Sequence, residues 1–209
     1  MASQEPTTSP TRRPYTGSCH CGHTKYITYL TIPPANLATA PDSSTSLRIR
    51  KCNCTTCHKM SFFHIRLPSS PSDFLLLSPL NPVQGGLNDY TCFDHEIHWY
   101  FCPTCGVRCF AFNGDNGGGD GEVVEVELET EVKGENGGKV GDKVKVWKPK
   151  TEGWIEGDTG YFSVNAHTLD AGQEGLDLRD WTEKGWILYL DMATDKEPRF
   201  GRPHDGGIY

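Results

Sequence analysis

No run of apolar residues in this chain reaches the ~20 residues that a membrane-spanning helix requires. The first residues, MASQEPTTSPTRRPYTG, also lack the apolar core of a signal peptide. Both absences predict a soluble, cytoplasmic protein that has no membrane partner. Because thiols stay reduced in that compartment, abundant cysteine there indicates metal binding more often than a disulfide framework.

Positive charge is also scarce. The 209 residues carry a formal net charge of −7, whereas non-specific binding of nucleic acids depends on clustered Lys and Arg. Nucleic acid is therefore not an expected partner. The one basic run contains Arg48, Arg50 and Lys51, and a solvated strand face explains it as well as a phosphate site would.

A long helical repeat of apolar residues is the third absence. Short apolar, β-branched and aromatic runs, separated by Pro, Ser and Gly, predict strands instead. These predicted strands are 24–30, 47–52, 62–67, 74–78, 96–101 and 107–112, followed by the segments GYFSVNAHTLD and GWILYL. The fold class is therefore predicted to be mainly β.

The length predicts one domain with a substantial hydrophobic core. Residues 1–14 are polar and rich in Pro, Ser and Thr, which predicts a disordered leader. The domain would then span residues 15–194, and the polar residues 195–209 would form a surface tail. Within the domain, the Gly-rich segment 113–143 holds the alternating sequence EVVEVEL and is followed by KVKVW, which predicts an inserted hairpin at the surface.

Seven of the nine cysteines fall into three clusters. The clusters are Cys19 with Cys21, then Cys52 with Cys54 and Cys57, and finally Cys102 with Cys105. The other two cysteines, Cys92 and Cys109, stand alone and are expected to be small core residues.

The sequence CPTCG, which begins at Cys102, is typical of a metal knuckle. Pro103 favours the first position of a turn, and Gly106 tolerates the conformation that brings backbone amides toward the second sulfur. A knuckle supplies two ligands, and Cys19 and Cys21 can supply two more. Together they would form a closed tetrahedral zinc site that staples the N-terminal segment to the middle of the chain.

The remaining cluster then offers three thiolates, and three protein ligands with an open position are typical of a catalytic zinc. Alternatives are a structural zinc completed by His58 or His64, a disulfide framework, and a C-x-x-C redox pair. The odd number of cysteines disfavours disulfides, and no thioredoxin-like βαβ pattern surrounds the pair. His58 directly follows a ligand, so it is a candidate for orienting a thiolate or moving a proton.

The motifs GSCHCG, CNCTTCHK and YFCPTCG, in this order, resemble those of the glutathione-dependent formaldehyde-activating (GFA) enzymes and the related centromere protein V. The segments FLLLSP, HWYFCPTCGVRCFAF and YFSVNAHTLD are also similar, so the resemblance covers residues 15–112 and 154–190. It implies a β-tent fold of small antiparallel sheets. It also implies a structural zinc on Cys19, Cys21, Cys102 and Cys105, and a more labile zinc on Cys52, Cys54 and Cys57.

Two positions depart from the usual pattern of that family. Asn53 stands where His is common, and His58 stands where Arg is common. The Gly-rich insertion is also longer than usual. These differences bear on the second metal site and on the rim of the pocket, and therefore on the identity of the substrate.

A zinc ion with an open position can bind a thiol substrate and stabilise its thiolate. We therefore expect a carbon–sulfur lyase acting on glutathione-like thiol adducts of aldehydes or related electrophiles. Its catalytic residues would be Cys52, Cys54, Cys57 and His58. Nearby cations would offset the thiolate charge and bind substrate carboxylates, namely Lys51, Lys59 and Arg66, with Arg48 and Arg50 close in sequence. The alternative is a non-catalytic, zinc-stapled protein-interaction module.

Overall fold

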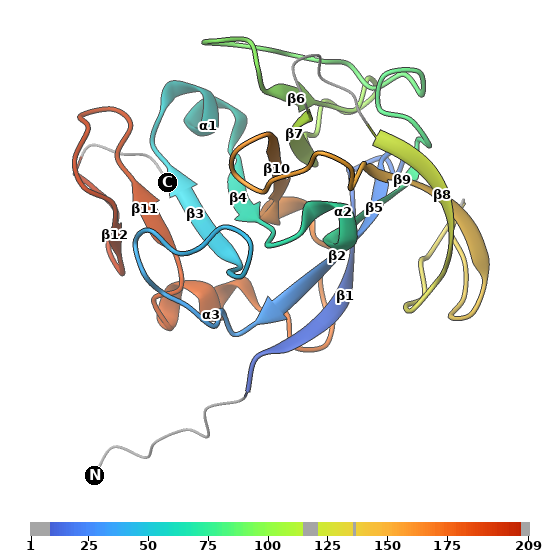
Figure 1. Cartoon of the computed structure of the whole chain (residues 1–209), viewed down its shortest axis with the longest axis horizontal. Coiled ribbons are helices and arrows are strands. Elements are labelled where there is room, and N and C mark those ends of the chain that lie inside the picture. Colours follow the sequence, from blue (N-terminus) through green and yellow to red (C-terminus); the bar gives the residue numbers. More distant parts are fainter. Residues whose placement is uncertain (1–8, 115–120, 136, 206–209) are drawn as a thin grey trace.

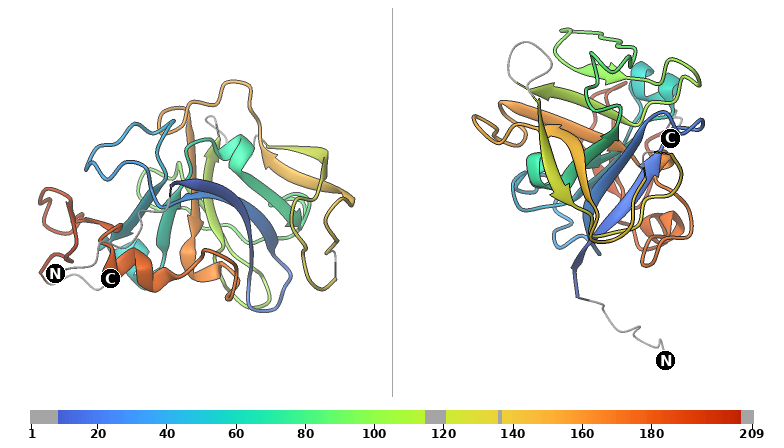
Figure 2. Two further views of the ribbon diagram at one scale, coloured as in Figure 1. Left: turned by 90° about the horizontal axis from the view of Figure 1, so that it is seen from below. Right: turned by 90° about the vertical axis from the view of Figure 1, so that its right-hand side faces the viewer.

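The computed structural model describes residues 9–114, 121–135 and 137–205. Within them, twelve strands form two sheets, with three short α-helices and one 3₁₀ helix (Ala166–Thr168) beside them. The prediction of a mainly β fold is confirmed. Figure 1 shows the β8–β9 hairpin at one end of the molecule and β11 with β12 at the opposite end, and Figure 2 shows the same separation.

The five-stranded sheet is antiparallel throughout and has the order β1-β2-β5-β9-β8. Its strands are β1 (Thr11–Ser18), β2 (Lys25–Ile32), β5 (Phe74–Ser78), β9 (Lys143–Pro149) and β8 (Gly121–Glu127). The first two strands form a hairpin in which Ser18 pairs with Lys25. The cysteines at 19 and 21 therefore lie in the turn of this hairpin.

The seven-stranded sheet has the order β12-β11-β3-β4-β10-β7-β6. Its strands are β12 (Arg199–Phe200), β11 (Leu188–Leu190), β3 (Arg48–Cys52), β4 (Phe63–Arg66), β10 (Gly160–Asn165), β7 (Phe110–Gly114) and β6 (His98–Tyr100). Only the β11–β3 pair among these is parallel. The helices are α1 (Thr55–Met60), α2 (Ser70–Asp73) and α3 (Leu178–Glu183).

The core follows from strand alternation, because successive side chains point to opposite faces of a sheet. Ile49, Ile65 and Val164 come from three neighbouring strands and are buried in the main hydrophobic cluster. The residues between them, including Arg50 and His64, point to the other face. That second face carries the candidate site.

The insertion contributes more than the expected surface excursion. Its two alternating segments pair as β8 and β9, as predicted, from Glu127 with Lys143 to Gly121 with Pro149. β9 then joins β5 where Leu76 pairs with Trp147, and Trp147 is only 1% exposed. The hairpin therefore completes a sheet and contributes to the core. Much of the Gly-rich run, residues 115–120, lies outside the described residues.

Both expected terminal segments are more ordered than predicted. β1 begins at Thr11, inside the expected leader, and Arg12 donates a hydrogen bond to the Asp73 carboxylate at 2.8 Å. In the expected tail, β12 pairs with β11, and Nε2 of the buried His204 lies 3.2 Å from the Tyr189 carbonyl oxygen. Residues 1–8 and 206–209 lie outside the described residues. Across the part that is described, every helix is too short or too polar to cross a membrane.

Candidate metal centre and pocket

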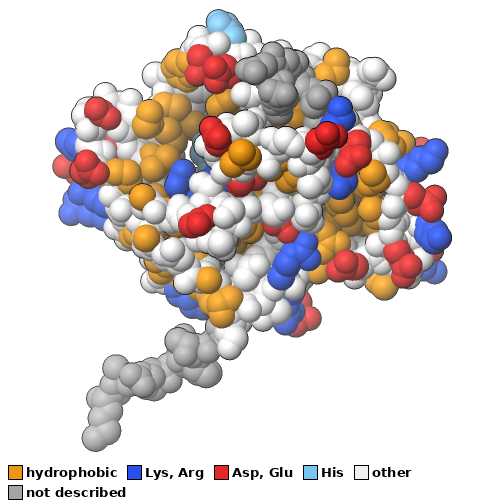
Figure 3. All heavy atoms as spheres, viewed as in Figure 1, with side chains coloured by type: hydrophobic (Ala, Val, Ile, Leu, Met, Phe, Trp, Pro, Cys, Tyr) orange, Lys and Arg blue, Asp and Glu red, His pale blue; other side chains and the backbone are white. Residues whose placement is uncertain are grey.

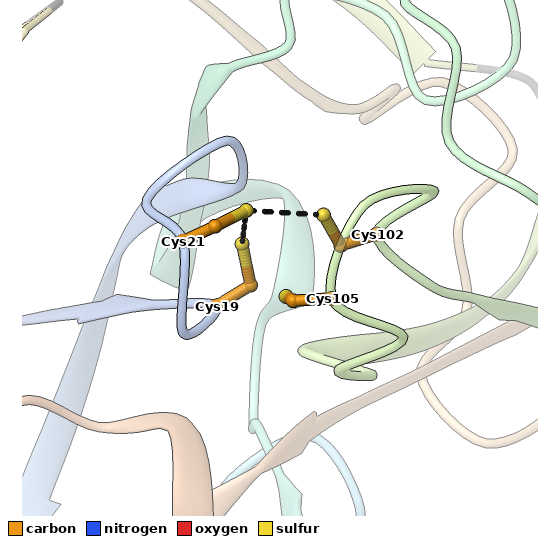
Figure 4. Close-up of side chains that lie close together, drawn as sticks. All are labelled: Cys19, Cys21, Cys102 and Cys105. Atoms are coloured by element: carbon orange, nitrogen blue, oxygen red, sulfur yellow. Dashed lines mark hydrogen bonds between the residues drawn. The ribbon is translucent and has the colours of Figure 1, made fainter.

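The structure brings Cys19, Cys21, Cys102 and Cys105 together, as predicted. Their four sulfur atoms lie within 4.8 Å of one another, with Cys19 to Cys21 at 3.6 Å and Cys21 to Cys102 at 3.5 Å. Figure 4 shows the side chains pointing toward one another from the β1–β2 turn and from the loop after β6. Tetrahedral zinc with Zn–S distances of about 2.3 Å places its sulfurs about 3.8 Å apart. The geometry therefore fits a closed four-thiolate zinc site.

Backbone geometry holds these sulfurs in place. Gly22 and Gly106 have φ angles of 77° and 72°, in the left-handed region that glycine adopts at least cost. The Gly106 N–H donates to the Cys102 carbonyl at 2.9 Å, and the Thr24 N–H donates to the Cys19 sulfur at 3.2 Å. Because turn amides approach the sulfurs, both loops are already shaped for a bound cation.

The pKa of Cys105 is shifted in the direction that a metal ligand needs. Burial acts to raise this pKa, but the backbone N–H groups of Val107 and Cys21 and the thiols of Cys102 and Cys19 outweigh it and lower it to about 6. Cys105 therefore ionises more easily than an ordinary thiol, and zinc binds the thiolate form of cysteine.

The structure also brings together Cys52, Cys54 and Cys57, a group that we call the triplet. Its three sulfurs lie within 4.8 Å of one another, which fits three ligands on one ion. Cys52 ends β3, Cys54 caps the N-terminus of α1, and Cys57 lies in the first turn of that helix. The Cys57 N–H donates to the Cys54 sulfur at 3.4 Å, and the Cys54 N–H donates to the Cys52 sulfur at 3.4 Å.

Hydrogen bonds among the triplet concentrate negative charge on its middle member. The hydrogen bond with Cys52, and to a smaller extent the one with Cys57, lowers the pKa of Cys54 to about 2. The bond with Cys54 raises the pKa of Cys52 to about 11, and bonds with Cys52 and Cys54 raise the pKa of Cys57. These hydrogen bonds favour the thiolate form at Cys54, and the thiolate is the form in which cysteine binds zinc.

His64 lies behind the triplet and has partners at both ring nitrogens. Its Nε2 is 3.1 Å from the Cys57 sulfur and its Nδ1 is 2.8 Å from the Ser163 hydroxyl. Burial, followed by the charge of Arg66, lowers the pKa of His64 to about 3, so the ring is neutral. Among the described residues, the closely spaced ligand groups are the two cysteine groups alone. This arrangement favours His64 as a hydrogen-bond partner of Cys57 over His64 as a fourth ligand.

Asn53, which lies between Cys52 and Cys54, anchors the loop of the triplet. Its side-chain amide donates to Asp191 at 2.8 Å, and its carbonyl oxygen accepts from the N–H groups of Met192 and Ala193 at 2.8 and 3.2 Å. These bonds tie the triplet to the segment that follows β11. The sequence carries no local signal for this pairing, because the partners are 138 to 140 residues apart.

A pocket of about 670 Å³ opens onto the triplet. Its floor is the non-core face of the seven-stranded sheet, where Arg50 pairs with His64 across β3 and β4. The other floor side chains come from neighbouring strands, and they are Arg66, Trp99 and Tyr161. Four large apolar residues also line the pocket. Phe93 and Ile97 come from the loop before β6, Leu190 ends β11, and Met192 follows it. In Figure 3, hydrophobic side chains gather over the end of the molecule that carries α1 and β11.

Arg48 and Arg66 are buried on this face, so Arg48 does not belong to a solvated strand face, which was one of the two explanations for the basic run. They are 5% and 8% exposed, and both approach the buried Glu156, at 3.5 and 3.9 Å. This burial depends on contacts between residues that are far apart in the sequence. The β3–β4 register places Arg48 opposite Arg66, and both lie near the Glu156 carboxylate. Burial lowers the pKa of Arg48 to about 10, and the positive charges of Arg66 and Arg50 contribute to the same shift.

The other predicted site residues are distributed over two sides of the triplet. Arg66 lines the large pocket, whereas Lys51 and His58 line a smaller hollow of about 110 Å³ that shares Cys52 and Cys57 with it. Lys59 is exposed on α1, and it is not among the described residues that line the large pocket or the smaller hollow. Among the aromatic residues near the triplet, Trp99 lines the large pocket, while Phe62 and Phe63 line the hollow. Arg50, one of the predicted cations, also lines the large pocket, whereas Tyr161 was not among the predicted site residues.

The two isolated cysteines differ from each other. Cys109 is 2% exposed in the main core, as expected. Cys92 is half-buried in the loop before β6, and its sulfur lies 3.5 Å from the Thr56 hydroxyl. It packs against the apolar cluster around the triplet but does not belong to either close cysteine group.

A second large hollow, of about 760 Å³, lies between β1 and the segments 130–133 and 170–174. Arg13 pairs with Glu174 there, and Asp170 accepts hydrogen bonds from the Thr16 and Ser18 hydroxyls. No cysteine or histidine lines it among the described residues. The pocket above the triplet is therefore the better candidate for chemistry.

Comparisons with known proteins give no family for this chain. No protein-family model matches it, and no curated protein matches it either. A search of solved structures finds a crystal structure of a Rhodobacter sphaeroides protein, a structural genomics target. The two chains share 17% identity over 84% of this chain and 99% of the other, with a TM-score of 0.38. A likeness this weak supports no conclusion about fold or function.

Proposed function

We propose that this protein is a zinc-dependent carbon–sulfur lyase that acts on glutathione-like thiol adducts of aldehydes or related electrophiles. One observation carries the proposal: three mutually close cysteine sulfurs open onto a pocket whose floor holds Arg50 and Arg66. A metal site with three protein ligands can accept a substrate sulfur, and the arginines can bind the carboxylates of a thiol such as glutathione.

The proposal assigns different roles to the two cysteine groups. The four-cysteine group would hold a structural zinc, because all of its tetrahedral positions are occupied by protein sulfurs. The triplet would hold a second, more labile zinc. We also infer that the two sheets form the tent-like arrangement of GFA enzymes, with the four-cysteine site joining the turn after β1 to the loop after β6.

Zinc bound at the triplet would lower the pKa of a substrate thiol enough for it to be a thiolate at neutral pH. Three cysteine thiolates and a substrate thiolate around Zn²⁺ carry a net charge of −2. Arg50 and Arg66 lie on the floor beside Cys52 and would offset this charge. Trp99 and Tyr161 would exclude water from the same space.

The reaction itself needs one bond change and one proton transfer. In the cleavage direction, the carbon–sulfur bond of a hemithioacetal breaks and its electron pair stays on sulfur. The hydroxyl proton leaves and the carbon becomes a carbonyl group. We assign the proton transfer to His58 acting through water, because His58 lines the hollow on the other side of Cys52 and Cys57 and does not line the large pocket. His64 and Ser163 would hold the Cys57 sulfur in place.

The test is a screen of thiol adducts with the zinc-loaded protein, with product mass as the readout. Glutathione mixed with formaldehyde or with larger aldehydes supplies the hemithioacetals, and exchange spectroscopy measures how fast adduct and free thiol interconvert. We expect acceleration with zinc-loaded protein and none after chelation of the labile ion. Equal rates in both samples, for every adduct, would leave the non-catalytic interaction module as the better description.

A further inference from the structure

The pocket above the triplet is chemically divided. Arg50 and Arg66 make its floor cationic, whereas Phe93, Ile97 and Met192 make its outer wall apolar. A ligand that satisfies both parts must carry an anionic group and a large apolar group. The division therefore restricts the class of substrate more than the metal site alone does.

Arg50 is the cation of this floor that lacks a partner. Arg66 has Glu156 at 3.9 Å and stacks on the Tyr161 ring at 3.8 Å. Arg50 is half-buried, its guanidinium makes no hydrogen bond or ion pair with the described residues, and its Nε is buried without an acceptor. A partly desolvated charge without a counterion is destabilising. A carboxylate ligand would remove that cost, because a guanidinium matches it with two parallel hydrogen bonds.

The position of Arg50 limits where the carboxylate lies in the ligand. Arg50 and Cys52 are two residues apart on β3, so their side chains leave the same face with Cα atoms about 7 Å apart. A carboxylate a few bonds from the sulfur can therefore reach Arg50 while the sulfur lies at the triplet. The cysteinyl-glycine part of glutathione meets this spacing.

The apolar wall is unusually exposed. Phe93 is 71% exposed and Met192 is 65% exposed, although both line the pocket. Phe93 also has a φ angle of 60°, which is rare for a bulky residue and costs conformational energy. Exposed apolar side chains at the rim of a pocket are typical of ligand contacts. Formaldehyde adds one carbon to sulfur, which is too small to cover this wall.

Building on the proposed function, we propose that the substrates are thiol adducts with a carboxylate that binds Arg50 and a large apolar group on sulfur. That group lies against Phe93, Ile97 and Met192. Cleavage breaks its carbon–sulfur bond, releases the hydroxyl proton and yields a large apolar aldehyde with the free thiol. The volume of about 670 Å³ is in the range that accommodates such a ligand.

Binding of uncleavable analogues tests this inference apart from turnover. S-alkylglutathiones from methyl to octyl have no hydroxyl on the attached carbon, so they cannot release an aldehyde. Calorimetric titration of the zinc-loaded protein should show affinity rising about three- to fourfold for each methylene group that is buried. Phe93→Ala and Met192→Ala should reduce this dependence on chain length. An affinity that is equal from methyl to octyl would overturn the apolar contact.

The diethyl ester of S-hexylglutathione tests the contact with Arg50. We expect the ester to bind at least tenfold more weakly than the acid to the unmodified protein, and this difference to disappear in Arg50→Met. Arg50→Lys should restore part of it, and a thermal melt checks that both variants fold. The control Arg179→Met removes an exposed cation on α3 and should keep the full difference. An ester that binds as well as the acid would overturn the role of Arg50.

The two proposals fail in different ways. If long-chain conjugates bind tightly but no adduct is ever cleaved, the lyase function fails and the described ligand class stands. If the formaldehyde adduct is cleaved and chain length has no effect, the lyase function stands and this inference fails.

Discussion

The Nε2 atom of His64 lies 3.1 Å from the Cys57 sulfur, and the opposite ring nitrogen lies 2.8 Å from the Ser163 hydroxyl. The three residues come from β4, α1 and β10, so this chain of hydrogen bonds joins the triplet to the middle of the seven-stranded sheet. Partners of this kind orient metal ligands and are needed for full metal affinity.

We therefore predict that His64→Gln weakens zinc binding at the triplet by about 10- to 100-fold. Ser163→Ala should have the same effect with a smaller magnitude, because it removes only the outer hydrogen bond. Competition with a chromogenic chelator measures the labile zinc directly. The four-cysteine site is the internal control, and its zinc should be retained in both variants. Unchanged chelation kinetics would contradict the positioning role of His64.

Cys54→Ser should separate the proposed function from folding. The Cys54 thiolate is half-buried at the start of a short helix, and serine can still cap that helix. We expect a melting temperature close to that of the unmodified protein, together with loss of the labile zinc and of adduct turnover. Metal analysis and the turnover assay are the two readouts. Full activity in this variant would exclude the triplet from the chemistry.

Cys102→Ser should have the opposite profile. Cys102 is 1% exposed, and its sulfur lies 3.5 Å from Cys21, which belongs to a distant part of the sequence. Because a structural zinc contributes its binding energy to folding, we expect insoluble protein or a much lower melting temperature. Cys92→Ser is the matched control, since Cys92 lies outside both cysteine groups. Equal melting temperatures for the two variants would contradict the structural assignment.

Local sequence patterns were enough to predict most strands and the two cysteine groups. The segments 24–30, 62–67 and 74–78 correspond closely to β2, β4 and β5, because short apolar, aromatic and β-branched runs bounded by turn residues are typical of strands. Each cysteine cluster was predictable because the spacing of ligands in a loop is a local property. The union of Cys19 and Cys21 with Cys102 and Cys105 is long-range, and it was predictable only because a tetrahedral zinc needs four ligands.

The missed features have identifiable physical reasons. β1 includes Arg12, Arg13 and Pro14, so its apolar alternation is weak, and pairing with β2 stabilises it instead. α1 has six residues, too few to display a helical period, and its start depends on a cap from Cys54. The floor of the pocket depends on the order of strands from β3 to β6, which no local pattern contains.

The buried Glu156 provides a prediction about stability that depends on this strand order. Its carboxylate approaches Arg48 at 3.5 Å and Arg66 at 3.9 Å, and it accepts hydrogen bonds from the Ser70 hydroxyl at 2.8 Å and the Trp154 indole at 2.9 Å. Glu156→Gln keeps the shape and an acceptor oxygen but removes the negative charge. Two buried guanidinium groups would then face each other without a counterion.

We expect Glu156→Gln to lower the free energy of unfolding by about 3–5 kcal/mol, because breaking a buried ion pair leaves an uncompensated charge. Denaturant unfolding measures the change. Glu174→Gln is the matched control, since Glu174 pairs with Arg13 at the surface, where its side chain is 86% exposed. Water and salt screen that pair, so the control should unfold almost as the unmodified protein does. Similar midpoints for the two variants would show that Glu156 does not neutralise Arg48 and Arg66.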